Sequence, residues 1–446
     1  MKIAYIAAGA GRMRCGACSW DMALVQALGD RGHHVWLIPL YTPLMAVDRL
    51  PVKPTRVFYG GINVYLEQVS SFFRRTPHLL DHLLDSEWLL GMASYFALST
   101  APQDLGPMTV SVLEGQAGNQ RRELDKLLHF LGESRPQVVG LANSLLSALA
   151  PPVREQLHIP VVSALQGEDG FVASFPEPYR TRALDAIRRN CRSVDLFLAP
   201  GTSYAHRMAS YLDVPEERIA VVGYGIDTEL YQPRPEQGQE SSKPSHQAFT
   251  VGYLSRLTPG KGLDILVEAV RILVQEERRD VRLRVAGQRL DAKFWRNIQS
   301  LAAARGLAER FEYVGELGFD DKVAFLRELD VFCLPSRHPE AHGTAAMEAM
   351  ACGIPVVVPA LGVFPELVER TGGGIMFPPG DSVRLASELA GLMDEPARWR
   401  ELGRRAREGI VAHYSTDAMA ADATAAFGRL RIGDSRGAPE AMRTEK

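Results

Sequence analysis

The sequence is poor in cysteine, in long apolar runs and in any excess of one charge. Its five cysteines lie mostly in apolar segments, which is typical of a reducing compartment rather than of a disulfide framework. No apolar run approaches the roughly 18 residues that a transmembrane helix needs. The 50 basic and 53 acidic residues nearly cancel, which does not favour nucleic-acid binding. These absences indicate a cytoplasmic protein with no nucleic-acid partner.

What the sequence has is a regular alternation of short apolar runs and segments of helical period. With 446 residues, 46% of them hydrophobic, the chain is long enough to bury two cores. The N-terminal residues Met1–Gly9 are predicted to form a first strand rather than a signal peptide. Such alternation is typical of parallel sheets with helices on both faces. The sequence therefore predicts an α/β protein with two Rossmann-like domains.

Polar segments set the predicted domain limits. Residues 233–247 have no apolar period and are rich in Pro, Gln, Ser and Glu, so they are predicted to link an N-terminal domain (1–232) to a C-terminal domain (248–415), and residues 431–446 to be disordered. Helices are expected at Ser19–Asp30, Ser144–Gln156, Thr202–Leu212 and Thr416–Leu430. Strands are expected at Ile3–Ala7, His34–Ile38, Val138–Leu141, Val161–Ala164, Leu196–Ala199, Ile219–Val222, Thr250–Tyr253, Arg282–Val285, Phe311–Val314, Val331–Leu334, Val356–Val358 and Ile375–Phe377.

The most informative stretch of the chain is Pro339–Pro355, which holds Glu340 and Glu348 eight positions apart. It lies between two apolar runs, Val331–Leu334 and Pro355–Val358, that are predicted to be buried strands. Between these strands the sequence predicts a loop with one glycine and then a helix of about two turns, which ends at a Gly and a Pro.

The start of this helix is predicted to bind an anion. Gly343, Thr344 and Ala345 would point backbone N–H groups at it. Glu340 and Glu348 would repel the anion itself but can accept hydrogen bonds from hydroxyl groups attached to it. A sugar nucleotide has hydroxyls at both ends and a diphosphate between them. Without a ligand, Glu348 would only be an acid well placed in a helix dipole, and Glu340 an exposed surface acid.

Two cations, Arg256 and Lys261, follow directly after the predicted strand Thr250–Tyr253. Loops at the carboxyl ends of parallel strands are where such sheets bind ligands, and a guanidinium with an ammonium suits a diphosphate leaving group. The turn is not a Walker A loop, because Ser255 stands where the first glycine belongs and Gly262 where Ser or Thr belongs. The alternative is a solvated basic turn.

The loop after the first strand contains Gly9–Gly11 and a Cys-x-x-Cys pair, Cys15 and Cys18. A dinucleotide-binding loop is one interpretation, but Arg14 occupies the third glycine position and no acid ends the second strand. A redox pair at the start of a helix is another. The third interpretation, that the cysteines are small packing residues, is favoured because nothing else resembles thioredoxin.

Several of these segments together resemble one known family. The Glu-x7-Glu stretch, the Arg-x4-Lys-Gly turn, the segment Gly225–Pro233 and the segment Leu361–Val368 are similar to motifs of the retaining GT-B glycosyltransferases of family four, the group 1 type. The match is dense from Val194 to Leu392. The resemblance implies a GT-B fold whose two parallel sheets face a central cleft, with the helix at 416–430 crossing back to the first domain.

The resemblance also implies roles for individual residues. Arg256 and Lys261 would stabilise the departing nucleoside diphosphate, Glu340 would contact the donor sugar, and Glu348 would hold the ribose. The remaining donor-binding residues would be Gly343, Thr344, Ala345 and, in the N-terminal loop, Gly16. A reaction without metal or other cofactor is implied, with a nucleotide diphosphate sugar as co-substrate. The sequence agrees, since it contains no Asp-x-Asp, the motif by which GT-A enzymes hold a cation.

This sequence departs from the family pattern at three positions. Gln166 replaces the histidine of the family's His-Gly-x-Asp segment, which here ends at Asp169. A glutamine can exchange hydrogen bonds with a sugar hydroxyl but cannot take a proton, which fits a front-face mechanism with the leaving phosphate as base. His342 stands where an apolar residue is usual, and Val363 replaces a glycine. Gln166, Asp169 and His342 are therefore predicted to contact the acceptor or the donor sugar.

The acceptor is not readable from the sequence and can be a sugar, a lipid or a small molecule. Phe72–Arg75 and the apolar run Leu79–Leu98 are either a surface that contacts the acceptor or the inner face of the membrane, or a buried helix pair, which is favoured. Two other functions use the same residues. A sugar-nucleotide epimerase would need an acid–base pair, and a non-catalytic binding protein would have no need to stabilise a leaving group.

Overall fold

The computed structural model describes residues 1–7, 16–41, 105–234 and 248–430. By its internal contacts the chain divides into two compact units. Unit 1 comprises Met1–Leu198, Met208–Ala220 and Ala423–Lys446, and unit 2 comprises Ala199–Arg207 and Val221–Asp422. The loop Gly9–Gly11 with Cys15, the insertion with Phe72–Arg75 and Leu79–Leu98, most of the linker and the tail lie outside the described residues. The predicted domain limits stay predictions.

The first sheet has six strands in the order β2-β1-β3-β4-β5-β6. Its central strands β3, β4 and β5 are buried along their whole length, as expected for continuous apolar runs covered on both faces. Helix α1 packs on β1 and β2. The strands are β1 (Lys2–Ala7), β2 (His34–Pro39), β3 (Val138–Leu141), β4 (Val161–Ala164), β5 (Leu196–Ala199) and β6 (Ile219–Val221). The helices that lie wholly in unit 1 are α1 (Gly16–Asp30), α5 (Gly106–Leu113), α6 (Arg121–Ser134), α7 (Ala150–Pro152), α8 (Glu168–Ala173) and α9 (Tyr179–Cys191), and the helices α10 (Thr202–Leu212) and α18 (Thr416–Gly428) have residues in both units.

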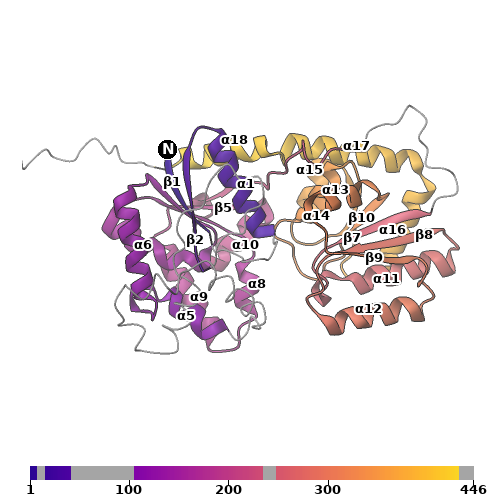
Figure 1. The fold of residues 1–446 in the computed structure, drawn as a ribbon, viewed down its shortest axis with the longest axis horizontal. Helices are drawn as coiled ribbons and strands as arrows, with labels where there is room; N and C mark the ends of the chain where they lie inside the picture. Colours follow the sequence, from indigo (N-terminus) through magenta and orange to yellow (C-terminus); the bar gives the residue numbers. More distant parts are fainter. Residues whose placement is uncertain (8–15, 42–104, 235–247, 431–446) are drawn as a thin grey trace, which may run out of the picture. The chain divides into compact units, whose positions relative to one another are not determined.

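The second sheet has six strands in the order β12-β11-β10-β7-β8-β9, and its order reverses between β7 and β10. Helices α11 and α12 cover one face of this sheet, and α14, α15 and α17 lie on the other (Figure 1). The strands are β7 (Phe249–Leu254), β8 (Val281–Ala286), β9 (Phe311–Gly315), β10 (Val331–Cys333), β11 (Val356–Pro359) and β12 (Gly374–Phe377). The helices are α11 (Leu263–Arg271), α12 (Ala292–Ala304), α13 (Phe319–Arg327), α14 (Thr344–Ala351), α15 (Phe364–Thr371), α16 (Ser382–Asp394) and α17 (Pro396–His413).

The two parallel sheets confirm the predicted α/β class with two Rossmann-like domains. Every predicted strand is present, with ends that differ by about one residue. The helix predicted over Ser144–Gln156 is wrong in detail. It divides into a 3-10 helix (Ser144–Leu149), the short α7 and a π-helix (Val153–Leu157). The sequence Pro151-Pro152 explains this, because two prolines remove backbone donors in the middle of the segment.

Helix α17 lies unusually close to the chain between α15 and β12. A Cβ atom on Gly373 would stand 2.2 Å from Cα of Ala406, and one on Gly409 would stand 2.5 Å from Cα of Thr371. Backbones can approach this closely only where side chains are absent. The small residues of α17 therefore fix this helix against the second sheet, and its cationic side chains can reach neighbouring carbonyl groups.

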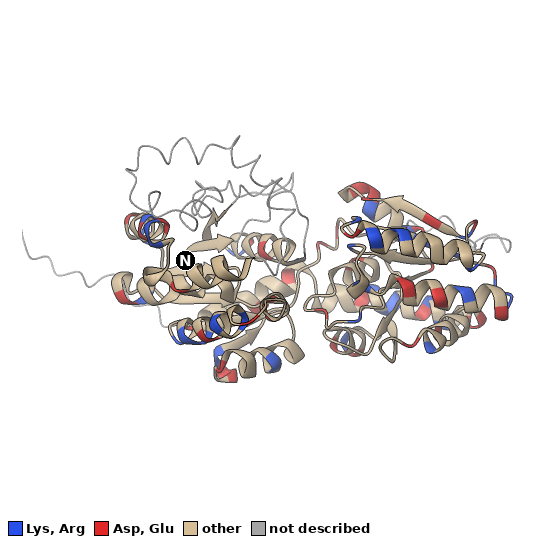
Figure 2. Cartoon of the chain, turned by 90° about the horizontal axis from the view of Figure 1, so that it is seen from below, with Lys and Arg blue, Asp and Glu red and all other residues tan. Residues whose placement is uncertain are grey.

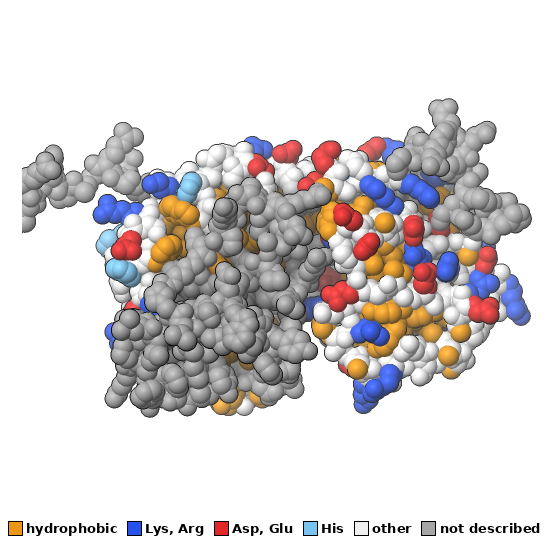
Figure 3. Space-filling view, in the orientation of Figure 1, with side chains coloured by type: hydrophobic (Ala, Val, Ile, Leu, Met, Phe, Trp, Pro, Cys, Tyr) orange, Lys and Arg blue, Asp and Glu red, His pale blue; other side chains and the backbone are white. Residues whose placement is uncertain are grey.

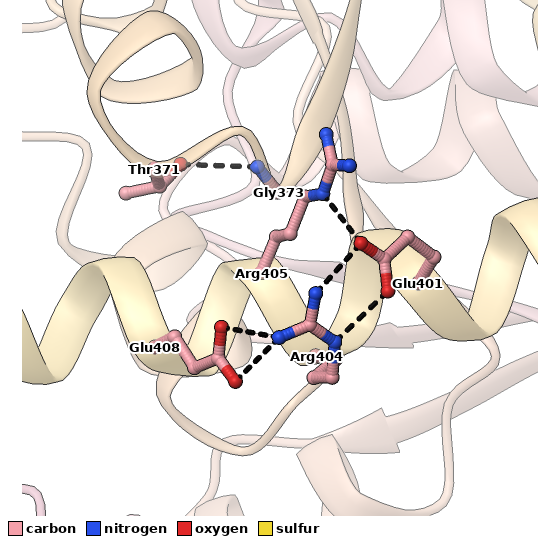
Figure 4. A network of polar contacts seen from close by, with 6 residues as sticks. All are labelled: Thr371, Gly373, Glu401, Arg404, Arg405 and Glu408. Carbon is pink, nitrogen blue, oxygen red and sulfur yellow. Dashed lines mark hydrogen bonds and ion pairs between the residues drawn. The ribbon is translucent and has the colours of Figure 1, made fainter.

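The opposite face of α17 is polar. Arg404 donates to both Glu401 and Glu408, and Arg405 donates to Glu401 (Figure 4). These hydrogen bonds hold the pKa of Glu401 at about 2. Acidic and basic residues are interspersed along helices of both units in the view of Figure 2, as is typical of solvated helix faces.

Apolar side chains also reach the surface. In Figure 3 they lie among charged side chains on the visible face of unit 2, and Leu290, Val383 and Val411 are the exposed large apolar residues of the described chain. Among the helices of the described ranges, none combines the length and the apolar character that a membrane span requires.

Candidate functional site

The site is built on the two loops that leave the second sheet where its strand order reverses. The loop after β7 carries Arg256 and Lys261, and the loop after β10 carries Glu340. In open α/β sheets the connections on either side of a reversal run to opposite faces, and their divergence leaves a crevice at the carboxyl ends of the strands. The topology thus brings together the two motifs that the sequence separates by about 80 residues.

Lys261 and Glu340 form an ion pair across these loops. The Nζ atom of Lys261 donates to Oε1 of Glu340 at 2.5 Å, and the hydroxyl of Ser336 donates to the same oxygen. The two charged side chains are 20% and 16% exposed. The turn at Lys261 depends on Gly262, which has a φ of +70° and whose missing Cβ would stand 1.9 Å from the carbonyl oxygen of Pro335. A partly exposed pair of this kind can exchange its partners for a ligand's charges.

A second contact fixes the same two loops. Arg337 donates to the two carboxylate oxygens of Asp264 at 2.7 and 2.5 Å and to the carbonyl oxygen of Pro259 at 2.8 Å. Its own backbone N–H donates to the carbonyl oxygen of Gly260 at 2.9 Å. Such a bidentate guanidinium contact is geometrically specific, so it holds the Lys261 turn in register with the Glu340 loop.

The backbone of Glu340 rests on Gly362. This glycine has a φ of +63°, and a Cβ there would stand 2.5 Å from the Glu340 nitrogen. The next residue, Val363, donates its N–H to the Glu340 carbonyl oxygen at 3.0 Å. The segment Leu361–Val368, which carried part of the family resemblance, thus packs against the backbone of Glu340 and supports its loop.

Arg256 lies apart from this network. Its side chain is exposed, and within the described ranges no acid pairs with it. The structure places Arg256 and Lys261 in one loop but does not bring Arg256 into contact with Glu340. A guanidinium that no described acid pairs with can receive an anionic ligand without first breaking an ion pair of this part of the chain.

Helix α14 begins with backbone donors that have no carbonyl partner among the described residues. Gly343 is its N-cap in the left-handed conformation, with no side chain capping the helix. The following N–H groups, of Thr344 and Ala345, have no carbonyl partner within the described chain. The hydroxyl oxygen of Thr344 is also enclosed without a hydrogen-bond partner there. The start of α14 thus has backbone donors of the kind that an anion site uses, and the anion site at Gly343–Ala345 stays a prediction.

His342 is only 7% exposed, and its ring lies edge-on to that of Tyr224, with centroids 6.3 Å apart. Burial lowers the pKa of His342 to about 4, although the charge of Glu340 acts in the opposite direction. The imidazole is therefore neutral at pH 7 and adds no positive charge beside Glu340.

Glu348 lies in the second turn of α14 and is 7% exposed. Tyr231 donates its hydroxyl to Oε1 of Glu348 at 2.6 Å, and Lys322 of α13 donates its ammonium to the same oxygen. Sequence reasoning named Tyr231 only as part of the resemblance, and it missed Lys322. Nothing in the spacing of the two residues could have paired Lys322 with Glu348, because they lie on different helices.

Of the three residues predicted to contact the acceptor or the donor sugar, Gln166 and Asp169 lie in unit 1. Gln166 donates its side-chain N–H to Oδ1 of Asp21 at 2.6 Å and its backbone N–H to Oε2 of Glu168 at 2.6 Å. The side-chain oxygen Oε1 of Gln166 is enclosed and has no hydrogen-bond partner in the described chain. Asp169 lies in the first turn of α8, and Gly16 begins α1. Burial raises the pKa of Glu168 despite its hydrogen bonds. Sequence reasoning missed both Asp21 and Glu168.

The predicted site residues thus fall into two sets, each described within its own unit. Unit 2 contains both cations, both glutamates, His342 and the start of α14, and unit 1 contains Gln166, Asp169 and Gly16. In the part of the chain that the structure describes, no three His, Cys, Asp or Glu side chains are placed to hold a metal ion.

Comparison with known families matches both halves of the chain. Residues 235–409 match the family described as glycosyl transferases group 1, and residues 105–230 match glycosyltransferase family 4. Together the two matches cover more than half of the chain.

Curated relatives cover smaller parts. The chain is 27% identical to the MMP alpha-(1->4)-mannosyltransferase of Mycolicibacterium hassiacum over 65% of its own length and 68% of that protein. It is 34% identical to the lipopolysaccharide core biosynthesis mannosyltransferase LpsB of Rhizobium meliloti over 43% of its own length and 54% of that protein. The chain thus spans only about half the length of some curated relatives that it matches.

Solved structures show the same fold at low sequence identity. The Anabaena protein HepE, solved in complex with UDP, has a TM-score of 0.66 at 18% identity and covers 96% of this chain and 100% of its own. The sucrose-phosphate synthase of Thermosynechococcus elongatus has a TM-score of 0.69 at 18% identity and covers 96% of this chain and 98% of its own. With the two parallel sheets described above, these likenesses confirm the predicted GT-B fold.

Proposed function

Since this chain belongs to the glycosyltransferases of family 4, the group 1 type, we propose that it moves a hexose from a nucleotide diphosphate sugar to an acceptor hydroxyl, with retention of configuration and without a metal ion. One observation carries the proposal. Lys261 and Glu340, far apart in the sequence, meet where the strand order of the second sheet reverses, on the loop that leads into α14.

The proposed diphosphate binds at the start of α14. The N–H groups of Gly343, Thr344 and Ala345 donate to its oxygens, and Arg256 and Lys261 supply the positive charge. As the bond between the sugar carbon and the phosphate oxygen breaks, negative charge grows on the phosphate. Groups that are already oriented toward that charge stabilise it without reorganisation, which is the role that a divalent cation would otherwise fill.

The ion pair of Lys261 with Glu340 has a consequence for this step. The diphosphate competes with Glu340 for the ammonium of Lys261, and the displaced carboxylate can then accept a hydrogen bond from a donor-sugar hydroxyl. The exchange is between partners of the same charge in a partly exposed place, so its net energetic cost is small.

The proton of the acceptor hydroxyl goes to the departing phosphate in this proposal, as the acceptor oxygen forms the new bond on the same face. Two side chains that are candidates for a base are unsuited to it. Gln166 has no basic atom, and His342, with a pKa of about 4, is a weak base. Retention through a front-face reaction is therefore the stereochemistry that these residues support.

The donor, the acceptor and the location are also proposals. GDP-mannose is the first donor to test, because one relative from Mycobacterium tuberculosis carries the name GDP-mannose-dependent alpha-(1-6)-phosphatidylinositol monomannoside mannosyltransferase. The acceptor is a sugar, a lipid or a small molecule carrying a hydroxyl. We place the reaction in the cytoplasm and, for a lipid acceptor, at the inner face of the membrane.

The test is a transfer assay with GDP-mannose, UDP-glucose and ADP-glucose, each with a pool of sugar, inositol and lipid acceptors, in the presence of a chelator. Nucleoside diphosphate release measures turnover, and the proton NMR coupling of the product's anomeric proton gives its configuration. Lys261→Ala should lower the rate of release about 10²- to 10³-fold, whereas Lys293→Ala, on the exposed surface of α12, should leave it unchanged. An epimer formed without acceptor, or donor binding without turnover in every combination, would overturn the proposal.

A further inference from the structure

We infer that Tyr231 and Lys322 are positioning residues, which hold one oxygen of the Glu348 carboxylate so that the other accepts a hydrogen bond from a ligand hydroxyl. This inference rests on the proposed function, because the hydroxyl would belong to the ribose of the bound nucleotide. Neither residue needs to touch that ribose itself.

Both hydrogen bonds to the Glu348 carboxylate from described residues go to the same oxygen. Tyr231 at 2.6 Å and Lys322 both donate to Oε1 of Glu348. Oε2 accepts no hydrogen bond from the described residues. Nor is Oε2 one of the fully enclosed side-chain atoms that lack a partner in the described chain. With both donors on one oxygen, the carboxylate cannot rotate freely, and its second oxygen keeps a fixed direction.

The donors are themselves fixed. The ring of Tyr231 packs edge-on against Phe319 with centroids 5.5 Å apart, and the ammonium of Lys322 lies 5.3 Å and 5.7 Å from the centroids of these two rings. The carbonyl oxygen of Tyr231 accepts from Arg407 at 2.7 Å, and the same guanidinium nitrogen donates to Ala351, the last residue of α14, at 2.8 Å. Tyr231 is thus connected to α14 at two positions, directly at Glu348 and through Arg407 at Ala351, so the position of its hydroxyl is fixed.

The charges agree with this assignment. A carboxylate as buried as that of Glu348 needs hydrogen-bond donors and a compensating positive charge, which Tyr231 and Lys322 supply. Burial, together with the charge of Glu348, raises the pKa of the Tyr231 phenol. The phenol therefore stays protonated and acts only as a donor. A carboxylate is a strong acceptor for a neutral hydroxyl.

A purely structural role would look similar in the absence of ligand, since the three side chains join α13, α14 and the segment before the linker. The two roles differ in their effect on binding. Loss of a structural contact weakens every nucleotide equally. Loss of positioning weakens only nucleotides that have the ribose hydroxyls.

The experiment is calorimetric titration with UDP, GDP and ADP, and with the 2′,3′-dideoxy form of whichever binds. The wild-type protein should prefer the ribose form by about tenfold, which is typical of one hydrogen bond to a charged group. Glu348→Gln, Tyr231→Phe and Lys322→Met should each reduce this preference to about twofold and leave the dideoxy affinity unchanged. Tyr313→Phe, which removes a hydroxyl bound to Gly287, and Lys293→Met are matched controls and should keep the full preference.

The outcomes separate the inference from the proposed function. If Tyr231→Phe and Lys322→Met weaken both ligand forms equally, or weaken neither, the positioning role is wrong while Glu348→Gln still marks the ribose contact. If the wild type shows no preference, or binds no nucleoside diphosphate, the proposed function fails with it. Thermal unfolding of each variant, measured without ligand, shows whether an equal loss arises from a damaged fold.

Discussion

Glu340 and Glu348 have the same kind of partners but different surroundings. In each, one carboxylate oxygen accepts from a lysine and from a hydroxyl, and no described residue donates to the other oxygen. The partners are Lys261 and Ser336 for Glu340, and Lys322 and Tyr231 for Glu348. The chemistry of the two clusters is thus almost identical, so their difference must come from what holds them.

The lysines differ most. The ammonium of Lys322 lies over two aromatic rings, whereas within the described chain no ring stacks on Lys261. Glu348 is part of a helix, and Glu340 lies on a loop supported by a glycine. We infer that the cluster of Glu348 is a permanent arrangement that presents an oxygen, and that the cluster of Glu340 is a temporary one that a ligand takes apart. The predictions below either separate the two clusters further or make them equivalent.

The largest effect is expected at Lys261. Lys261→Ala should lower kcat about 10²- to 10³-fold, because a positioned cation at a leaving group acts mainly in the transition state. Its partly exposed ion pair contributes at most about 1 kcal/mol to folding, so Tm should change little. Steady-state kinetics and thermal unfolding measure the two effects, with Lys293→Ala as the control. Near-normal turnover in Lys261→Ala would remove the distinction between an exchangeable and a fixed lysine.

His342 tests whether the Glu340 cluster has a second cation. Its folded-state pKa is about 4, below the ordinary value of 6.5, so the unfolded chain binds the proton more readily. The contribution of the neutral, buried His342 to the free energy of unfolding should therefore be complete above pH 6.5. The free energy of unfolding should fall by up to about 3 kcal/mol as the pH drops toward 4.

Urea unfolding at a series of pH values measures this loss. His342→Leu should remove the part of the pH dependence that lies between 6.5 and 4. His129→Gln is the control, since the side chain of His129 is 78% exposed and is therefore not buried on folding. An unchanged slope in His342→Leu would mean that the histidine titrates normally and that Glu340 has a cationic neighbour at mildly acidic pH.

Gly362 tests the support of the Glu340 loop. Gly362→Ala should lower the free energy of unfolding by about 1–3 kcal/mol and displace Glu340, because the new Cβ would stand 2.5 Å from the Glu340 nitrogen. Gly380→Ala is a matched control. Gly380 also has a positive φ, of +82°, but nothing lies within 4 Å of its Cβ position.

Both variants place an alanine in the left-handed conformation, but only Gly362→Ala brings a Cβ atom against the backbone of Glu340. The difference between their losses of stability therefore measures the cost of that contact alone. Turnover should fall only in Gly362→Ala. Equal losses of stability, with turnover kept in both, would show that the position of Glu340 does not depend on this contact.

The strands were predictable because their signal is local. A buried parallel strand is a continuous apolar run, and Val138–Leu141 or Val356–Val358 shows it without reference to any partner. The one regular element predicted wrongly, Ser144–Gln156, failed for a local reason too, since its two prolines outweigh the apolar period.

The candidate site was predictable only in part. Motif resemblance located Lys261, Glu340 and Glu348, and the strand order explains why their loops converge. The contacts of Lys322 with Glu348 and of Arg337 with Asp264 were not predictable, because each joins two elements whose register is set by packing. The glycine that supports Glu340 was visible in the sequence, but only the structure shows its left-handed conformation and the backbone beside it.

The smallest effect is also the most direct comparison of the two clusters. Glu340→Gln frees Lys261 from its carboxylate partner, so the variant should bind a nucleoside diphosphate more tightly, by about two- to fivefold for a partly exposed ion pair. Its turnover should nevertheless fall, because an amide is a weaker acceptor for a sugar hydroxyl than a carboxylate.

Glu348→Gln should have the opposite effect on affinity and bind the same nucleoside diphosphate more weakly. Calorimetric titration of both variants with one nucleoside diphosphate measures the two signs side by side. Weaker binding in both would mean that Glu340, like Glu348, is a fixed part of the binding surface and that the ion pair with Lys261 persists in the complex.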